Sequence, residues 1–140
     1  MPYQEVLELF RKLRLSSYRS IYENIRDREG SLSATEAYAV DAIYLLGEPT
    51  IKRFSDFLGI SQPNATYKVN SLIAKGYVEK VQSETDKRKM CLRVSDKFHR
   101  YYDQAENEIG QAANALREKF SAEEIGVFRR MLKALTDAIK

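Results

Sequence analysis

A short cationic segment in the middle of the chain, set between two stretches of strand-forming residues, constrains the fold more than any other feature. The segment covers residues 83–89 and reads Ser-Glu-Thr-Asp-Lys-Arg-Lys, a mixture of turn-forming and basic residues. The flanking stretches, residues 77–82 and 90–95, are short and rich in β-branched and apolar side chains, as strands are. The sequence therefore predicts a β-hairpin with a basic tip.

Two short helical patterns precede this hairpin. Residues 51–58 and 62–75 carry apolar side chains at helical spacing, and Gly59 lies between them as a turn residue. Ser61 can cap the second helix, and Gly76 is suited to end it. In the first helix we expect the buried residues to be Ile51, Phe54, Phe57 and Leu58. Helix, glycine turn, helix and basic hairpin is the order of elements in a winged helix-turn-helix, so we predict a mainly α fold with a small β-hairpin wing (α+β).

Longer amphipathic helices are expected on both sides of this lobe. Residues 4–28 form one, ended by Gly30, and Ser33 opens another with capping-box spacing; residues 96–120 and 121–140 form two more. The apolar seam of the helix after the hairpin is Phe98, Tyr102, Ala105, Ile109, Ala112, Leu116 and Phe120. The apolar stripe of the last helix is Ile125, Phe128, Leu132, Leu135 and Ile139. These faces either pack back on the lobe or pair with another chain, and their length favours pairing.

The charges are distributed unevenly along the chain. Residues 50–100 contain 11 basic and 5 acidic residues, a net charge of +6. Residues 1–49 carry −2 and residues 101–140 carry −1, which gives +3 for the whole chain. A basic middle between mildly acidic ends is typical of a surface that binds a polyanion, although an ordinary solvated surface is the alternative.

Length and composition exclude several classes of protein. A chain of 140 residues suits one domain or one protomer of an oligomer, and its core is large enough to need no disulfides. The single cysteine, Cys91, excludes an intrachain disulfide and suits a reducing compartment. Neither a membrane-spanning apolar run nor a signal-peptide pattern is found, so we expect a cytoplasmic protein without a membrane partner.

The residues needed for catalysis are not found in a recognisable pattern. His99 is the only histidine, and one histidine with one cysteine cannot form a zinc site of the usual kind. The chain contains no phosphate-cradling glycine loop and no nucleophile motif. We therefore expect no enzymatic activity, no metal and no cofactor.

The candidate binding residues lie on the second short helix and at the hairpin tip. The N-terminal part of such a helix enters the major groove of duplex DNA, where base edges require donors and acceptors. The polar residues available there are Ser61, Gln62, Asn64, Thr66, Tyr67 and Lys68. At the tip, Lys87, Arg88 and Lys89 supply the positive charge that a narrow minor groove attracts. Asp86 would repel phosphate, but it is well placed to orient Arg88 through a charge-assisted pair.

These two regions resemble the MarR (multiple antibiotic resistance regulator) family. The stretch Leu-Gly-Ile-Ser-Gln-Pro-Asn-Ala-Thr-Tyr-Lys-Val at residues 58–69, continued by Leu72 and residues 75–78, resembles the family's recognition-helix region. Asp86-x-Arg88, followed by Leu-x-Val-Ser at residues 92–95, resembles its D-x-R-x-x-x-L-x-L-T wing pattern.

The resemblance implies a homodimer built from a DNA-binding lobe at residues 31–96 and dimerisation helices at residues 1–30 and 97–140. Such dimers bind palindromic operators, usually as repressors relieved by a small ligand or an oxidant. Arg88 would be the minor-groove arginine and Asp86 its support. Four residues depart from the pattern: Tyr67 and Ser71 stand where many members have Arg, Asn70 replaces a frequent Asp, and Phe98 replaces a frequent Gly.

The resemblance also implies an effector cleft between the dimerisation helices and the lobe. Tyrosines of the first two helices could line it and bind a small aromatic or amphipathic effector, or they could pack in the core: Tyr18, Tyr22, Tyr38 and Tyr44. Redox-sensing members carry their reactive cysteine elsewhere, so we expect no sensing role for Cys91. The alternative function is a winged-helix protein-interaction module that binds no specific DNA.

Overall fold

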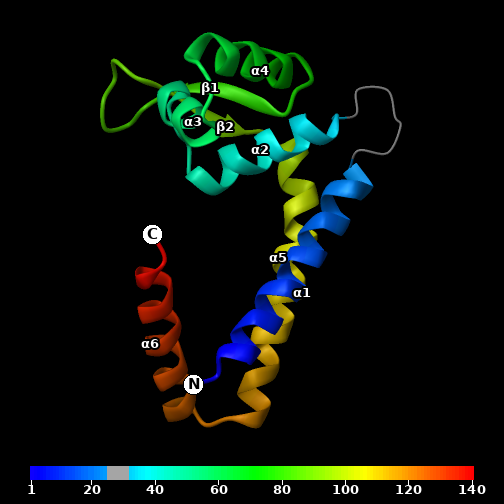
Figure 1. Ribbon diagram of the computed structural model, residues 1–140, viewed down its shortest axis with the longest axis vertical. Helices are drawn as coiled ribbons and strands as arrows, with labels where there is room; N and C mark the ends of the chain where they lie inside the picture. The colour runs from blue at the N-terminus through cyan, green and yellow to red at the C-terminus, as the bar shows by residue number, and fades with distance from the viewer. Residues whose placement is uncertain (25–31) are drawn as a thin grey trace. The chain divides into compact units, whose positions relative to one another are not determined.

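A computed structural model describes residues 1–24 and 32–140 of the chain, which form two compact units, Met1–Asp103 and Gln104–Lys140 (Figure 1). The division lies within a helix that continues from one unit into the other. The expected helix end at Ile25 to Gly30 lies outside the described residues, as do the side chains of His99, Tyr102 and Ala105.

The elements follow the predicted order. In sequence they are α1 (Tyr3–Asn24), α2 (Ala34–Leu46), α3 (Ile51–Leu58), α4 (Gln62–Ala74), β1 (Val78–Gln82), β2 (Met90–Val94), α5 (Asp96–Lys119) and α6 (Ala122–Ala138). The prediction of a mainly α fold with one β-hairpin is therefore confirmed.

Local sequence explains where these helices begin and end. Ser33 and Ser121 form the two predicted capping boxes at the starts of α2 and α6. Ser61 caps α4 by accepting a hydrogen bond from the backbone amide of Asn64. Gly59 and Gly76, at φ 67° and 81°, have the left-handed backbone that lets the chain turn out of α3 and α4.

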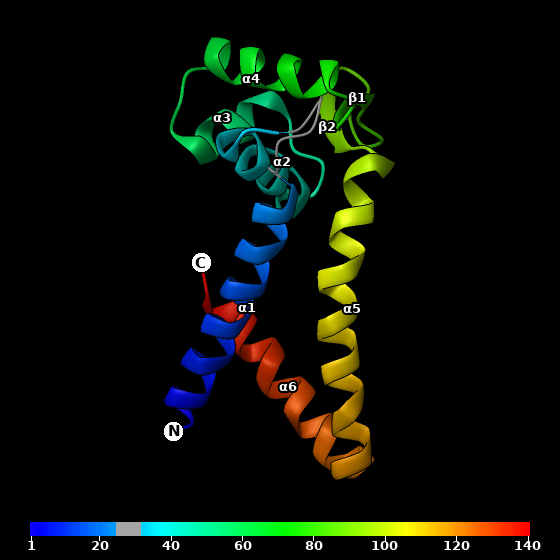
Figure 2. The same ribbon diagram turned by 90° about the vertical axis from the view of Figure 1, so that its right-hand side faces the viewer.

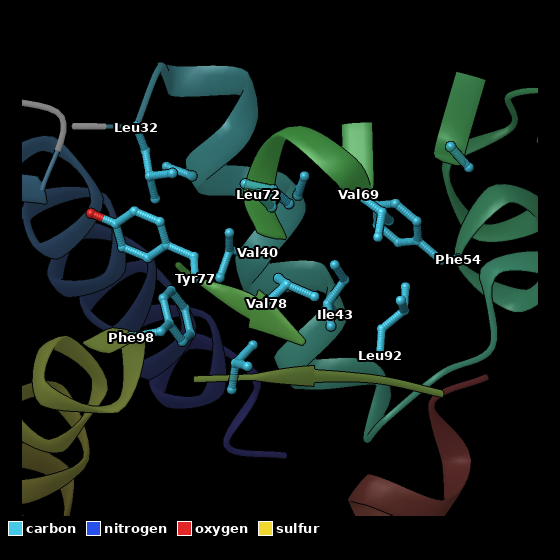
Figure 3. Close-up of a cluster of buried hydrophobic side chains, with 14 residues drawn as sticks. Leu32, Val40, Ile43, Phe54, Val69, Leu72, Tyr77, Val78, Leu92 and Phe98 are labelled. Atoms are coloured by element: carbon cyan, nitrogen blue, oxygen red, sulfur yellow. The ribbon is translucent and has the colours of Figure 1, made fainter. Parts of the chain in front are cut away.

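One hydrophobic core joins α2, α3, α4 and the hairpin (Figure 3). Fully buried side chains come from each of these elements: Ile43 from α2, Phe54 from α3, Leu72 from α4 and Leu92 from β2. Burying side chains of this size stabilises a fold by roughly 1.5–3 kcal/mol each. The core therefore fixes the three helices and the wing as one body.

The burial predicted for Phe57 is wrong. Its side chain is 62% exposed, whereas the small Ser55 is only 1% exposed. Each residue of a helix is turned by about 100° from the one before it. Viewed around the axis from Phe54, Ser55 lies on the same side as Ile51 and Leu58. Phe57 lies on the other side, about 60° from Phe54. Ser55 is accommodated in the core because its hydroxyl donates to the Lys52 carbonyl at 2.8 Å.

The hairpin lies beside the helices of the lobe (Figure 2), and its strand β2 is hydrogen-bonded along both edges. β1 and β2 pair antiparallel, from Val78 opposite Val94 to Gln82 opposite Met90. On its other edge β2 meets the segment before α3, where the Leu92 amide donates to the Pro49 carbonyl at 2.8 Å. The base of the wing is thus fixed to the start of α3, and only its tip is unsupported by other strands.

The second unit has a different surface. No residue of α6 is buried, and its apolar stripe includes Phe128, Leu132 and Leu135, each more than 40% exposed. Within this unit an apolar groove of about 440 Å³ is lined by residues such as Leu116, Phe120, Ile125, Phe128 and Met131. This exposed apolar surface is large for a chain that works alone in water.

Candidate nucleic-acid interface

Burial defines which face of α4 points outward. Ala65, Val69 and Leu72 are fully buried, so the opposite face is directed to solvent. At about 100° per residue, Tyr67 and Asn70 are close to the centre of that face. Tyr67 is 78% exposed and Asn70 is also exposed. These two side chains therefore project from the lobe into solvent.

The other candidate residues of α4 lie around this centre. Ser61, Gln62 and Asn64 are exposed at the start of the helix, whereas Thr66 and Lys68 are half-buried on its two flanks. Asn70 is not among the residues predicted to bind. The phase of the apolar residues would have identified it, because it lies one turn from Tyr67 and opposite the buried positions.

The wing tip is a compact turn held by its own hydrogen bonds. The Ser83 amide donates to the Lys89 carbonyl at 3.0 Å, and the Lys89 amide donates to the Asp86 carbonyl at 3.0 Å. The Gln82 side-chain amide donates to the Lys87 carbonyl at 2.7 Å. These bonds leave the three basic side chains, Lys87, Arg88 and Lys89, exposed at the tip.

Asp86 and Arg88 form an ion pair within this turn. One carboxylate oxygen of Asp86 accepts from both the backbone amide of Arg88, at 3.1 Å, and its Nε, at 3.2 Å. Hydrogen bonds from the Arg88 backbone and side chain hold the pKa of Asp86 below its usual value. The side chain of Arg88 is 90% exposed and that of Asp86 30%, so the rest of the guanidinium faces solvent.

A second cluster ties α4 to α2. Glu36, the capping-box glutamate of α2, accepts from Lys75 Nζ at 2.7 Å and from the Ser71 hydroxyl at 3.1 Å. It also accepts from the Ser33 amide at 3.0 Å. Burial raises the pKa of Glu36, but these hydrogen bonds outweigh burial and lower the pKa to about 2. Glu36 therefore stays ionised and fixes the rotation of α4 relative to α2.

A third contact fixes the base of the wing. Arg93 Nε on β2 donates to a carboxylate oxygen of Glu48 at 2.6 Å. This contact raises the pKa of Arg93. Glu48 has φ 55°, an uncommon conformation for a residue with a side chain, and it directly follows Gly47 in the loop after α2. The ion pair links this strained loop to the strand that leads to the tip.

The four tyrosines considered for an effector cleft lie in different environments. Tyr44 packs against the core and makes a tilted ring contact with Phe98, with the ring centroids 6.1 Å apart. Tyr18 accepts a hydrogen bond from Arg14 at 2.7 Å and is 44% exposed. Tyr22 and Tyr38 are more than half exposed. Tyr44 is half-buried and also lines a pocket of about 350 Å³, so a ligand role for any of the four tyrosines stays a prediction.

Other kinds of site have little support in the described residues. Cys91 is half-buried on β2 with a free thiol. Across residues 1–24 and 32–140, no group of three or more potential metal ligands comes together. No helix of the same described ranges combines the length and the apolar character needed to cross a bilayer.

Sequence comparison points to one family. Residues 31–89 match the sequence model of the MarR family. The chain is also 27% identical over 89 residues to YkoM of Bacillus subtilis (strain 168), described as an uncharacterised helix-turn-helix transcriptional regulator. That alignment covers 62% of this chain and 58% of YkoM, so the chain matches little more than half of the relative's length.

Structural comparison extends the likeness to almost the whole chain. A MarR-like transcriptional regulator of Thermotoga maritima is 26% identical, with a TM-score of 0.51 over 93% of this chain and 96% of the other. FabT of Streptococcus pneumoniae in complex with DNA is 24% identical, with a TM-score of 0.51 over 96% and 95%. A mutant of Escherichia coli MarR complexed with operator DNA is 19% identical, with a TM-score of 0.51 over 96% and 98%.

The two lower identities show the fold alone. The match over residues 31–89, the relative and the shared fold agree: the chain has a winged helix-turn-helix fold and its lobe is similar to that of the MarR family.

Proposed function

We propose that the chain is a cytoplasmic, sequence-specific transcriptional regulator that binds duplex DNA as a homodimer. The observation that carries this proposal is the wing tip, where Asp86 holds an almost fully exposed arginine. A guanidinium presented in this way can enter a narrow minor groove and meet its concentrated negative potential. The solved complexes of FabT and of E. coli MarR with DNA have the same fold.

The outward face of α4 suits the major groove of the same duplex. Gln62, Asn64, Tyr67 and Asn70 present donors and acceptors without a carboxylate among them. Amide side chains can pair with base edges through two hydrogen bonds, which gives sequence selectivity. We infer that α4 reads the bases while Arg88 reads the shape of the adjacent minor groove.

The dimer is inferred from the terminal helices. The apolar stripe of α6 and the apolar side chains of α1, including Phe10 at 53% exposure, are exposed in the single chain. A second copy that covered such faces would remove this apolar surface from water. Two lobes on one two-fold axis then require a pseudo-palindromic operator.

We further propose that the dimer is a repressor and that a small aromatic or amphipathic effector relieves repression. In the chain α1 precedes the lobe and α5 follows it, so a ligand bound to either helix would change the spacing of the two lobes in a dimer. The exposed rings of Tyr18, Tyr22 and Tyr38 are suitable contacts for such a ligand.

The test is to select duplexes bound by the protein from a randomised library. The selected sequence should contain two inverted half-sites whose centres are about 34–36 Å apart. Footprinting should then protect both half-sites. If no sequence is enriched over the starting library, specific DNA binding is wrong and the protein-interaction module becomes the better description.

A further inference from the structure

A groove lined by both polar and apolar side chains runs along one side of α4, where that helix lies against the beginning of α2. Its volume is about 260 Å³. The residues that matter here are Thr35 from α2 and Tyr67, Lys68 and Ser71 from α4. Tyr67 and Lys68 are among the residues predicted to bind DNA, whereas Thr35 and Ser71 are not. The groove therefore adds a surface that the sequence did not predict.

Lys68 faces this groove and not the outward direction of α4. It lies about 100° around the helix axis from Tyr67, on the same flank as Ser71 and Lys75, which contact Glu36 of α2. Tyr67 is largely exposed, whereas Lys68 is half-buried. A side chain on this flank points across the groove toward α2.

The geometry of a helix in the major groove decides what such a flank meets. A helix of about 10–12 Å diameter fills a groove of about 12 Å width. The outward face then approaches the base edges, and each flank faces one of the two sugar–phosphate walls. Lys68 and Thr35 are consequently placed at the wall, together with the edge of the Tyr67 ring.

The charge of the groove also suits a phosphate. Glu36 contributes a carboxylate, but both of its oxygens are engaged, one by Lys75 and the backbone of Ser33 and the other by Ser71. Its negative charge is thus paired within the protein. No ion pair of Lys68 is found among the described residues, so its positive charge is available to a ligand.

We propose that this groove binds one phosphate of the DNA backbone, with Lys68 as the cationic contact and the Thr35 hydroxyl as a second donor. The inference rests on the proposed DNA-binding function and assigns Lys68 to positioning the lobe on the duplex. It excludes Lys68 from reading a base. Thr35 then extends the DNA contact from the recognition helix and wing to α2.

The experiment measures fluorescence anisotropy of two duplexes over a range of salt concentrations. One duplex is the sequence selected from the randomised library, and the other is an unrelated sequence of equal length. Lys68→Ala should weaken binding to both equally, on the order of tenfold for each bound lobe at ~0.1 M salt, because about one counterion is no longer released. The salt slope should fall by about one for each lobe.

The companion variants separate charge from packing. Lys68→Arg should restore the salt slope, because it keeps the charge. Thr35→Ala should weaken both duplexes by a smaller factor and leave the slope unchanged, because a hydroxyl carries no charge. Lys133→Ala, which removes an exposed charge on α6, is the matched control and should change neither property.

A duplex with single neutral methylphosphonate linkages identifies the contact directly. At one position per half-site the wild type should lose affinity, and Lys68→Ala should lose no more there. If Lys68→Ala lowers the affinity for the selected duplex only, or for neither duplex, the assignment of Lys68 to a phosphate is wrong. If the wild type binds neither duplex, the proposed function itself fails; if Arg88→Ala weakens binding and Lys68→Ala does not, only this inference fails.

Discussion

At the scale of single residues, the wing tip pairs a carboxylate with the arginine that we propose contacts DNA. Asp86 uses one oxygen to bind both the backbone and the side chain of Arg88, so it fixes the turn and the direction of the guanidinium together. An exposed ion pair of this kind adds little to folding stability. Its contribution is expected in DNA binding, where a guanidinium that is already oriented loses less entropy.

Substitutions at the tip should separate these roles. Arg88→Ala should weaken binding to the selected duplex by about ten- to a hundredfold, since it removes one specific contact per lobe. Asp86→Ala should cause part of the same loss even though it removes a repulsive charge. Urea denaturation should show both variants as stable as the wild type. Tighter binding by Asp86→Ala would refute the supporting role.

Glu36 predicts how stability depends on acid. Its folded pKa, about 2, lies below the ordinary value of 4.5, so its contribution is complete above about pH 4.5 and is lost as the pH falls toward 2. A pKa lowered from 4.5 to about 2 corresponds to roughly 3 kcal/mol of stability at neutral pH. Glu36→Gln should therefore destabilise the lobe near pH 7. In urea titrations, its free energy of unfolding should also fall less steeply than that of the wild type as the pH drops below about 4.5. An unchanged acid limb would contradict this role.

Asp41, which like Glu36 belongs to α2, predicts the opposite dependence of stability on pH. Burial raises its pKa from 3.8 to about 6, and its Oδ1 finds no hydrogen-bond partner among the described residues. The folded state therefore favours the protonated form, and stability falls as the pH rises from about 4 to 6. Asp41→Asn should raise the melting temperature at pH 7 and have little effect at pH 3. A destabilised Asp41→Asn at pH 7 would show an undetected partner.

At the scale of elements, turns and caps were predictable because they depend on neighbouring residues. The capping boxes at Ser33 and Ser121 and the turn at Gly59 are local, and the structure confirms them. Burial was less predictable, because an apolar residue on a short helix can point away from the core, as Phe57 does. Contacts between distant segments, such as Glu48 with Arg93, leave no pattern in the sequence.

The glycine turn of the helix-turn-helix gives a prediction with a matched control. Gly59 has φ 67° and Gly126 is helical within α6, and an added Cβ meets no atom within 4 Å at either position. Gly59→Ala should destabilise the lobe by about 1–2 kcal/mol, because the left-handed conformation is costly for alanine. Gly126→Ala should stabilise α6 by about 0.5–1 kcal/mol. If thermal denaturation shows both variants to be stabilised, or both to be destabilised, the argument is refuted.

At the scale of the whole molecule, the fold and the resemblance to the MarR family could be recognised from the sequence, but the roles of the individual side chains on α4 could not. Helical spacing alone places Tyr67 and Asn70 opposite the apolar positions of α4, but only the structure shows that Lys68 lines a groove beside α2. The reason is that the rotation of α4 is set by Glu36, 39 residues before Lys75. Under the proposed function, such long-range contacts would decide which side chains meet the bases and which meet the DNA backbone.

The last prediction joins the terminal helices to the strength of DNA binding. Phe128→Glu places a charge in the exposed apolar stripe of α6, so it should yield a monomer in sedimentation velocity at micromolar concentration. Ala134→Glu adds the same charge about 120° from the stripe and should remain dimeric.

A wild-type dimer that makes about six to ten phosphate contacts should lose about 10³–10⁵ in affinity between 50 and 200 mM salt. The Phe128→Glu monomer has one lobe. The dependence of its affinity on salt should therefore be about half that of the wild-type dimer, and its footprint should cover a single half-site. Because each lobe keeps its core, the monomer should still bind weakly and melt as a folded protein. A Phe128→Glu protein that stays dimeric would exclude this stripe from the interface. A wild-type monomer with an asymmetric footprint would contradict the homodimer and favour the protein-interaction module.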